Sequence, residues 1–186
     1  MENQRKLILY IAISLDGYIA GPEDDLSFLS IVDQEGEDYG YSKFIQTIDT
    51  IIMGRKTFDI VMKMVEVFPH GDKACYIITK NPKPDAGKVR FYAGDLKELI
   101  LKLKNKPGKD IFCDGGAEIV NALLEEKLFD ELIISIIPVL LGTGKRLFCR
   151  EYPFQNLKLV ESKSFKSGLA QLKYKIDESK FQKDIK

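Results

Sequence analysis

The chain has 186 residues, 45% of them hydrophobic, which is enough for one well-packed domain and short for two. Its 28 Lys and Arg residues are balanced by 28 Asp and Glu residues, so no overall field attracts nucleic acid or an anionic membrane. We therefore expect one domain over residues 1–186, no nucleic-acid partner and no membrane partner, and any recognition of phosphate has to be local.

In chain order, the sequence predicts a parallel sheet flanked by helices, because strand-like and helix-like runs alternate. The predicted elements are a strand over 7–14, a helix marked by Phe44, Ile45 and Ile48, a strand over 50–53, a helix marked by Phe58, Val61, Met62 and Val65, strands over 74–79 and 89–92, a helix marked by Leu96, Leu99, Ile100 and Leu103, a strand over 110–113, a helix marked by Ile119, Val120, Leu123 and Leu124, and a strand over 131–137.

The last forty residues change character. Apolar and polar residues alternate in GLAQLKYKI, which is typical of a strand with one solvated face, and LKLVESKSF before it is also strand-like. We expect these two runs to form an antiparallel pair that closes one edge of the sheet. The tail from about residue 178 is polar, and we expect it to fray. The apolar runs RKLILYIAIS and LIISIIPVLL are too short for a signal peptide or a membrane span, and we interpret both as buried strands.

Cysteine and histidine are scarce. Cys75, Cys113 and Cys149 are far apart and form no CxxC pair, and His70 is the single histidine. This pattern favours neither a disulfide framework nor a metal site, and it fits a reducing cytoplasm. We expect each cysteine to be a small core residue and His70, in FPHGDK, to be a solvated loop residue.

Two strand-to-helix turns share one design. In IIMGRKTF a strand ends at Gly54 and a helix starts beside Arg55, Lys56 and Thr57, and IFCDGGAEI repeats the pattern with two glycines. The free N–H groups at a helix start can hold an anion, and glycine lets a ligand approach the backbone. Each turn alone is equally consistent with a solvated joint. Two of them in one chain favour a ligand with more than one anionic group, such as a dinucleotide.

Other motifs that bind nucleotides are missing. GTGKRLF has the wrong glycine spacing for a phosphate loop and Arg146 where Ser or Thr is needed, and no GxGxxG follows the first strand. No Ser, His and Asp set stands out.

Four motifs in order, SLDG, MGRKT, DGGAE and PVLLGTG, carry a family resemblance. Over residues 5 to 176 the chain resembles the dihydrofolate reductase superfamily, in the branch related to the C-terminal reductase domain of bifunctional riboflavin-biosynthesis enzymes. The resemblance implies a three-layer αβα fold with an eight-stranded, mostly parallel sheet and an antiparallel final edge. It also implies NADPH as hydride donor, a small heterocyclic substrate and a homodimer that pairs through sheet edges.

The same resemblance assigns the cofactor-binding residues. The turn at Gly54, Arg55, Lys56 and Thr57 resembles the one that holds the cofactor phosphates. The resemblance places the other cofactor-binding residues as follows: Thr79, Lys80 and Asn81 at the 2′-phosphate, Gly115, Gly116, Ala117, Glu118 and Ile119 at the pyrophosphate, and Ala12 and Ile19 at the nicotinamide.

The substrate side rests on two carboxylates. Counting back from Gly54 at the spacing of dihydrofolate reductases places the substrate-anchoring acid at Asp38, with Tyr41 on the same helix face, although an exposed carboxylate at a helix start explains Asp38 equally well. Asp16 resembles the aspartate of the SLDG loop in the riboflavin-type reductases. The sequence has no tryptophan and departs from the folate-reducing pattern around Asp38.

The sequence thus predicts an NADPH-dependent reductase, most like 5-amino-6-(5-phosphoribosylamino)uracil reductase of riboflavin biosynthesis, with Asp38 and Asp16 as candidate catalytic groups. A pterin reductase of the dihydrofolate reductase type is one alternative. A protein that binds NADPH without turnover is a second, and a purely structural homodimer is a third.

Overall fold

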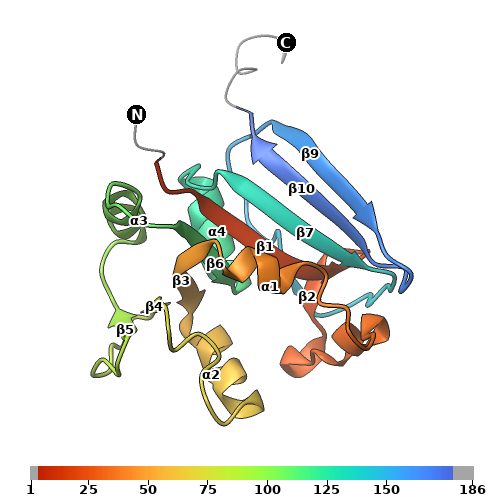
Figure 1. Cartoon of the computed structure of the whole chain (residues 1–186), viewed down its shortest axis with the longest axis horizontal. Coiled ribbons are helices and arrows are strands. Elements are labelled where there is room, and N and C mark those ends of the chain that lie inside the picture. Colours follow the sequence, from red (N-terminus) through yellow and green to blue (C-terminus); the bar gives the residue numbers. More distant parts are fainter. Residues whose placement is uncertain (1–3, 178–186) are drawn as a thin grey trace.

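An eight-stranded sheet runs through the centre of the computed structural model, which describes residues 4–177 (Figure 1). The strand order is β5-β4-β3-β6-β1-β7-β10-β9, parallel from β5 to β7 and antiparallel for β10 and β9. The strands are β1 (Leu7–Ser14), β2 (Tyr18–Ala20), β3 (Ile48–Gly54), β4 (Ala74–Ile78), β5 (Val89–Tyr92), β6 (Asp110–Gly115), β7 (Glu131–Ile137), β8 (Lys145–Arg146), β9 (Leu157–Ser164) and β10 (Ala170–Ile176).

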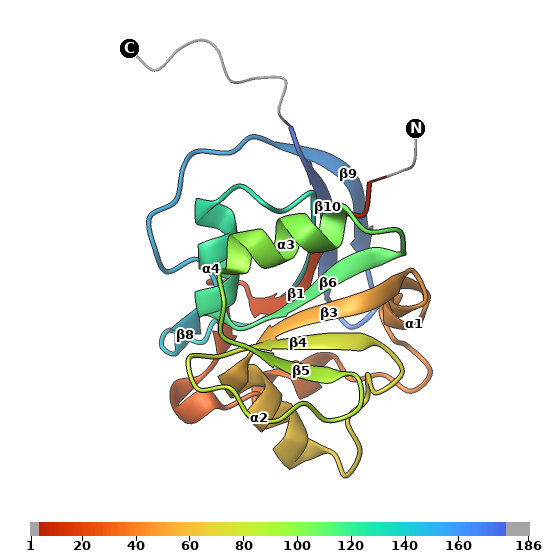
Figure 2. The ribbon, with the colours of Figure 1, turned by 90° about the vertical axis from the view of Figure 1, so that its left-hand side faces the viewer.

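Helices cover both faces of the sheet, which is why the central strands are hydrophobic on both sides. Figure 2 looks at the β5 edge and shows α3 and α4 on one face and α2 on the other. The helices are η1 (Pro22–Asp24), η2 (Ser27–Val32), α1 (Tyr41–Ile45), α2 (Arg55–Met64), α3 (Leu96–Lys104) and α4 (Ala117–Glu125). This arrangement confirms the expected three-layer αβα fold with a mostly parallel sheet.

The core has one cluster on each side of the sheet and a third near η2. On the α3–α4 face, Leu9 of β1 packs with Ile100 and Leu123. On the opposite face, the two rings of α1 pack on Phe112 of β6, and Phe28 of η2 packs toward the end of β7. The two faces alternate along each strand, so Tyr10 and Ala12 of β1 face the α1–α2 side.

The predicted antiparallel edge is confirmed. β10 pairs with β7 and β9 pairs with β10, and every residue of β9 is exposed. The Asp95 carboxylate accepts a hydrogen bond from the Glu98 N–H at 2.8 Å and caps α3, which is half of a capping box. The polar tail expected to fray lies outside the described residues.

Three sequence interpretations were wrong. Ile48 does not belong to the helix of Phe44, because α1 ends at Ile45 and Ile48 starts β3 in register with Asp110. Cys149 is exposed, unlike the other two cysteines. His70 is 7% exposed, because its ring packs edge-on against Phe68 within the loop that follows α2.

Within the part of the chain that the structure describes, we find no helix with the length and apolar character needed to cross a membrane.

Candidate functional site

Two strand-to-helix turns meet at the carboxyl ends of adjacent parallel strands. Met53 of β3 pairs with Gly115 of β6, so the turn at Gly54 lies beside the turn at Gly115 and Gly116. The backbone N–H of Gly116 donates to the Thr57 hydroxyl at 3.0 Å and ties the turns together. The structure therefore brings together the two glycine turns predicted from the sequence, at the edge where parallel sheets bind ligands.

A side chain on the glycines of these turns would crowd a neighbour or strain the backbone. A Cβ on Gly54 would lie 3.2 Å from Cγ1 of Ile119, and a Cβ on Gly116 would lie 3.0 Å from the Thr57 hydroxyl. Gly115 has a φ of +96°, in the region that favours glycine. These residues form a cradle of bare backbone that side chains would fill.

The helices that follow the turns begin without a side-chain cap. Gly54 precedes α2 and Gly116 precedes α4, and neither N-cap residue provides a capping side chain. An uncapped start has free N–H donors at the positive end of the helix dipole, and both favour an anion. Ala117 is buried and Glu118 is exposed in the first turn of α4. The residues present therefore fit a ligand with two linked phosphate groups.

Arg55 is positioned by two neighbours. Its Nε donates to both carboxylate oxygens of Asp59 at 2.8 Å, and its guanidinium lies over the Phe91 ring, 5.4 Å from the ring centroid. Among residues 4–177 no hydrogen bond partner is found for its two Nη groups. Lys56 beside it is exposed. Arg55 can therefore present its two Nη amino groups to an anion while its position is fixed.

The segment from Thr79 to Asn81 starts next to this arginine. Gly54 pairs with Ile78, the last residue of β4, so residue 79 leaves the sheet beside the start of α2. The Asn81 N–H donates to the Thr79 hydroxyl at 3.2 Å, which shapes a short turn, and Lys80 is exposed. The residues expected at a 2′-phosphate thus border Arg55.

Ala12 and Ile19, expected at the nicotinamide, pack in different places. Ala12 lies on the α1–α2 side of β1 and contacts the cluster around Phe28. Ile19 of β2 packs against the core cluster of the α3–α4 face. The two residues share no hydrophobic cluster, and their role stays a prediction.

Asp16 fastens one loop to another. Its carboxylate accepts from the Ser14 hydroxyl at 2.6 Å and from the N–H groups of Leu141 at 3.1 Å and Gly142 at 2.7 Å. The hydrogen bond from Ser14, followed by those from the backbone, lowers the pKa of Asp16 to about 2. Asp16 is therefore ionised at neutral pH and holds the loop after β1 against the loop after β7.

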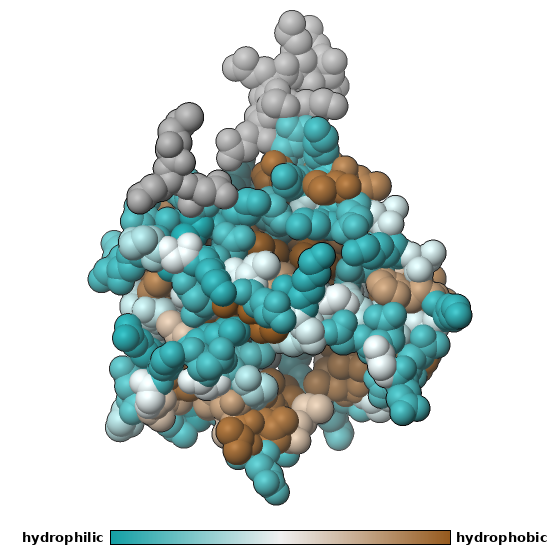
Figure 3. Space-filling view, viewed as in Figure 1, coloured by the Kyte–Doolittle hydropathy of each residue, from teal (hydrophilic) through white to brown (hydrophobic). Residues whose placement is uncertain are grey.

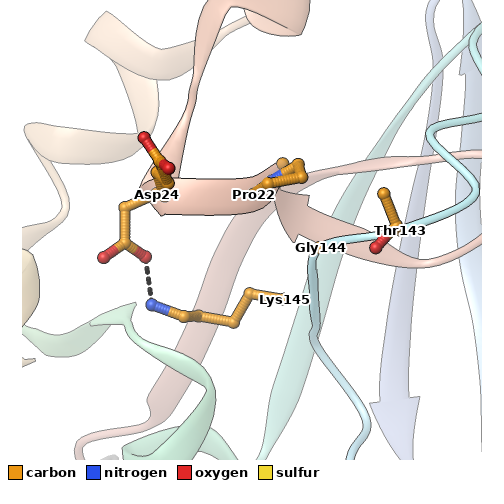
Figure 4. A pocket seen from close by; sticks show the side chains of 7 residues that line it. Pro22, Asp24, Thr143, Gly144 and Lys145 are labelled. Atoms are coloured by element: carbon orange, nitrogen blue, oxygen red, sulfur yellow. Dashed lines mark hydrogen bonds and ion pairs between the residues drawn. The ribbon is translucent and has the colours of Figure 1, made fainter.

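An open pocket of about 430 Å³ lies between η1 and the loop after β7 (Figure 4). Figure 4 shows Lys145 and Asp24 pointing toward each other across it, joined as an ion pair. A Cβ on Gly144 would overlap the carbonyl oxygen of Ala20, so only glycine allows this close approach. Residues on both sides of this close approach therefore line the pocket together.

Asp38 caps the start of α1. Its two carboxylate oxygens each accept a backbone N–H at 2.8 Å, one from Gly40 and one from Ser42, and these bonds, those of Ser42 foremost, lower the pKa of Asp38. Asp38 is exposed, whereas Tyr41 is half-buried and places its hydroxyl 3.4 Å from Nε2 of His70. The geometry favours the capping interpretation of Asp38, and no contact joins Asp38 to Asp16 among residues 4–177.

Asp114 is a candidate that the sequence reasoning missed. It is the last residue of β6 before Gly115, and its charge acts on Tyr41 and Cys75, which belong to the cluster on the α1–α2 side of the sheet. Burial raises its pKa to about 7. Its negative charge helps raise the pKa values of Tyr41 and Cys75, after the larger effect of their own burial. No hydrogen bond partner for its carboxylate is found within residues 4–177.

A signal for Asp114 was present in the sequence. A carboxylate at a strand position with the same parity as a buried Phe has to point into the interior or into a cleft.

Cys75 and Cys113 are not nucleophile candidates, because burial raises their pKa values to about 12. Over the described ranges no group of His, Cys, Asp and Glu is arranged to hold a metal ion.

Comparison with known proteins places this geometry in a family context. The family model described as the RibD C-terminal domain matches residues 5–171. The uncharacterised protein YwjB of Bacillus subtilis is 41% identical over 163 residues, which cover 87% of this chain and 93% of YwjB.

Two solved structures show the same fold. A protein of Shewanella sp. PV-4 described under riboflavin biosynthesis superposes with a TM-score of 0.85 at 29% identity, over 92% of this chain and 99% of that one. Dihydrofolate reductase from Enterococcus faecalis, solved with NADP(H), has a TM-score of 0.65 at 17% identity, over 94% of this chain and 98% of that one. The second likeness concerns the fold alone.

Proposed function

Because the chain belongs to the RibD C-terminal domain family, we propose that it is an NADPH-dependent reductase that acts on a small nitrogen heterocycle. Family membership supports a reductase related to the riboflavin-type and dihydrofolate-type enzymes. NADPH and the heterocycle are parts of the proposal.

One observation carries the proposal: the two glycine turns lie side by side, both open uncapped helices, and Thr57 links them through Gly116. In this proposal the starts of α2 and α4 bind the pyrophosphate. Arg55, with Lys80 and Asn81 beside it, binds the 2′-phosphate. NADPH would supply a hydride, and hydride transfer depends chiefly on alignment and exclusion of water.

Asp114 suits the proton side of the reaction. Its pKa of about 7 lets the carboxyl hold a proton or give it up near neutral pH, as an efficient general acid requires. Its unpartnered oxygens are also free to accept N–H groups of a heterocycle. Asp16 and Asp38 are less suited to carry a proton, because hydrogen bonds to both carboxylates lower their pKa values. We therefore assign the proton-carrying role to Asp114 in place of these two residues.

A second candidate function is NADPH binding without turnover, since the cofactor cradle alone would support it. Turnover distinguishes the two. The test follows NADPH absorbance with a panel of aminopyrimidines and pterins, using the wild-type protein and Asp114→Asn. We expect at least one compound to be reduced, and Asp114→Asn to lower kcat by a factor of about 10² or more while NADPH still binds.

A matched control is Glu125→Gln, which removes an exposed carboxylate from α4. It should leave the rate unchanged. NADPH binding without oxidation across the whole panel would favour the non-catalytic candidate.

A further inference from the structure

The chain distributes carboxylates unevenly around the α1–α2 side of the sheet. Between residues 21 and 42, which span η1, η2 and the start of α1, there is no Lys, Arg or His. The same segment contains Glu23, Asp24, Asp25, Asp33, Glu35, Glu37 and Asp38.

The helix starts on the cofactor side, at α2 and α4, also differ from those at α1 and η2 in their ability to bind an anion. The starts of α2 and α4, on the cofactor side, carry no side-chain cap. The start of α1 is occupied by the Asp38 carboxylate, which accepts from the Gly40 and Ser42 N–H groups. The start of η2 is similarly occupied, because Asp25 accepts from the Ser27 N–H at 2.9 Å. Backbone donors that could bind a phosphate are therefore already used by carboxylates at these two starts.

Apolar surface borders the same side. Figure 3 shows hydrophobic surface over the end of α2 and over the η1–η2 region, on two sides of a hollow. Met64 and Val67, at and after the end of α2, are 66% and 79% exposed, and Ile31 of η2 is 52% exposed. Lys63 is exposed on α2, but at helical spacing it shares a face with Lys56 and Asp59.

From this charge distribution we infer that the substrate is a neutral or protonatable nitrogen heterocycle with an apolar substituent and no phosphate group. The inference rests on the proposed reductase function and specifies its substrate. A phosphate ester would need cationic side chains or free backbone N–H groups. Lys145 beside η1 is already paired with Asp24, and η2 and the start of α1 offer carboxylates. A heterocycle with N–H groups can donate to the unpartnered Asp114 carboxylate, and an apolar substituent would cover the exposed surface of α2 and η2.

This substrate class differs from the one suggested by the family resemblance, in which the reduced compound is a phosphoribosylaminouracil. The sheet and the cofactor turns follow the family, whereas the segment from 21 to 42 determines which charge is tolerated beside them. The two turns that bind phosphate groups would both be used by the cofactor.

The test measures ligand binding to the NADPH-saturated protein by calorimetry, using matched pairs of aminopyrimidines and pterins with and without a phosphate group. 5-Amino-6-(5-phosphoribosylamino)uracil and its dephosphorylated form are one pair. We expect the unphosphorylated member of each binding pair to bind at least tenfold more tightly. Tighter binding of the phosphorylated members would overturn the inference, as would the absence of binding by both members of every pair.

A charge variant provides a second readout. Asp38→Ser keeps a residue that caps helices well and removes the negative charge. It should shift the affinity ratio toward the phosphorylated member, whereas Glu126→Gln, which removes a carboxylate at the end of α4, should leave the ratio unchanged. An equal ratio in both variants would count against the inference. Failure of NADPH itself to bind would instead refute the proposed function, so the two failures are distinguishable.

Discussion

Asp114→Asn should remove a pH-dependent loss of stability, because the half-buried carboxyl resists ionisation. Its pKa is raised from an ordinary 3.8 to about 7, so the folded protein keeps a proton that the unfolded chain has lost. A raised carboxyl pKa means that folding stability is highest below pH 4 and falls as pH rises through 7. The shift of about three pKa units corresponds to at most about 4 kcal/mol. Since the side chain is partly exposed, we expect about half of this limit or less.

The assay is urea unfolding at a series of pH values and constant ionic strength, for the wild type and for Asp114→Asn. The difference in unfolding free energy should grow in favour of the variant between about pH 4 and pH 8, because Asn has no charge to bury. Glu125→Gln should follow the wild type throughout. A difference between Asp114→Asn and the wild type that does not change with pH would refute the reasoning about Asp114.

Two further predictions concern regions away from the site. Glu131 is 3% exposed and pairs with Lys6 and Lys173 at 2.8 Å. Burial raises the pKa of Glu131, but the two lysines lower it overall, so the ion pairs stabilise the fold above about pH 4.5 and this stabilisation is lost as pH falls. Glu131→Gln should cost about 1.5–3 kcal/mol in urea unfolding at pH 7 and less at pH 3, and an equal cost at both pH values would contradict this account. We also propose a homodimer through β9, an edge strand on which Leu157, Leu159 and Val160 are exposed. Light scattering should give a dimer mass for the wild type and for the control Leu101→Lys, and a monomer mass for Leu159→Lys. A wild-type monomer at micromolar concentration would exclude this dimer.

Much of the fold could be predicted because the strands that matter are short, continuous apolar runs. The predicted bounds 7–14, 89–92 and 131–137 are those of β1, β5 and β7. Glycine between a strand pattern and a helix pattern made the two turns recognisable, and a Cβ on Gly54 or Gly116 would crowd its neighbours. These features are local, and local sequence is sufficient to specify them.

The rest depends on contacts between distant segments. The composition of FPHGDK places His70 in a loop, as the structure does, but only the packing of Phe68 and Tyr41 shows that it is buried. Asp38 was placed by spacing alone, whereas its role as a cap depends on the backbone of Gly40 and Ser42. Asp114 stands between a cysteine and two glycines, and its raised pKa arises from burial that no single segment reveals.

The measurement that tests the central claim most directly is a fluorescence titration of NADPH and NADH into the wild type, Arg55→Ala and Lys63→Ala. The Arg55→Ala variant would lose a charge-assisted hydrogen bond to the 2′-phosphate, worth about 1.5–3 kcal/mol. We predict saturable binding of NADPH, tighter than that of NADH, and a loss of about tenfold or more in NADPH affinity for Arg55→Ala alone. Lys63→Ala removes the same charge from the other end of α2 and should change neither affinity. The absence of saturable NADPH binding to the wild type would contradict the account.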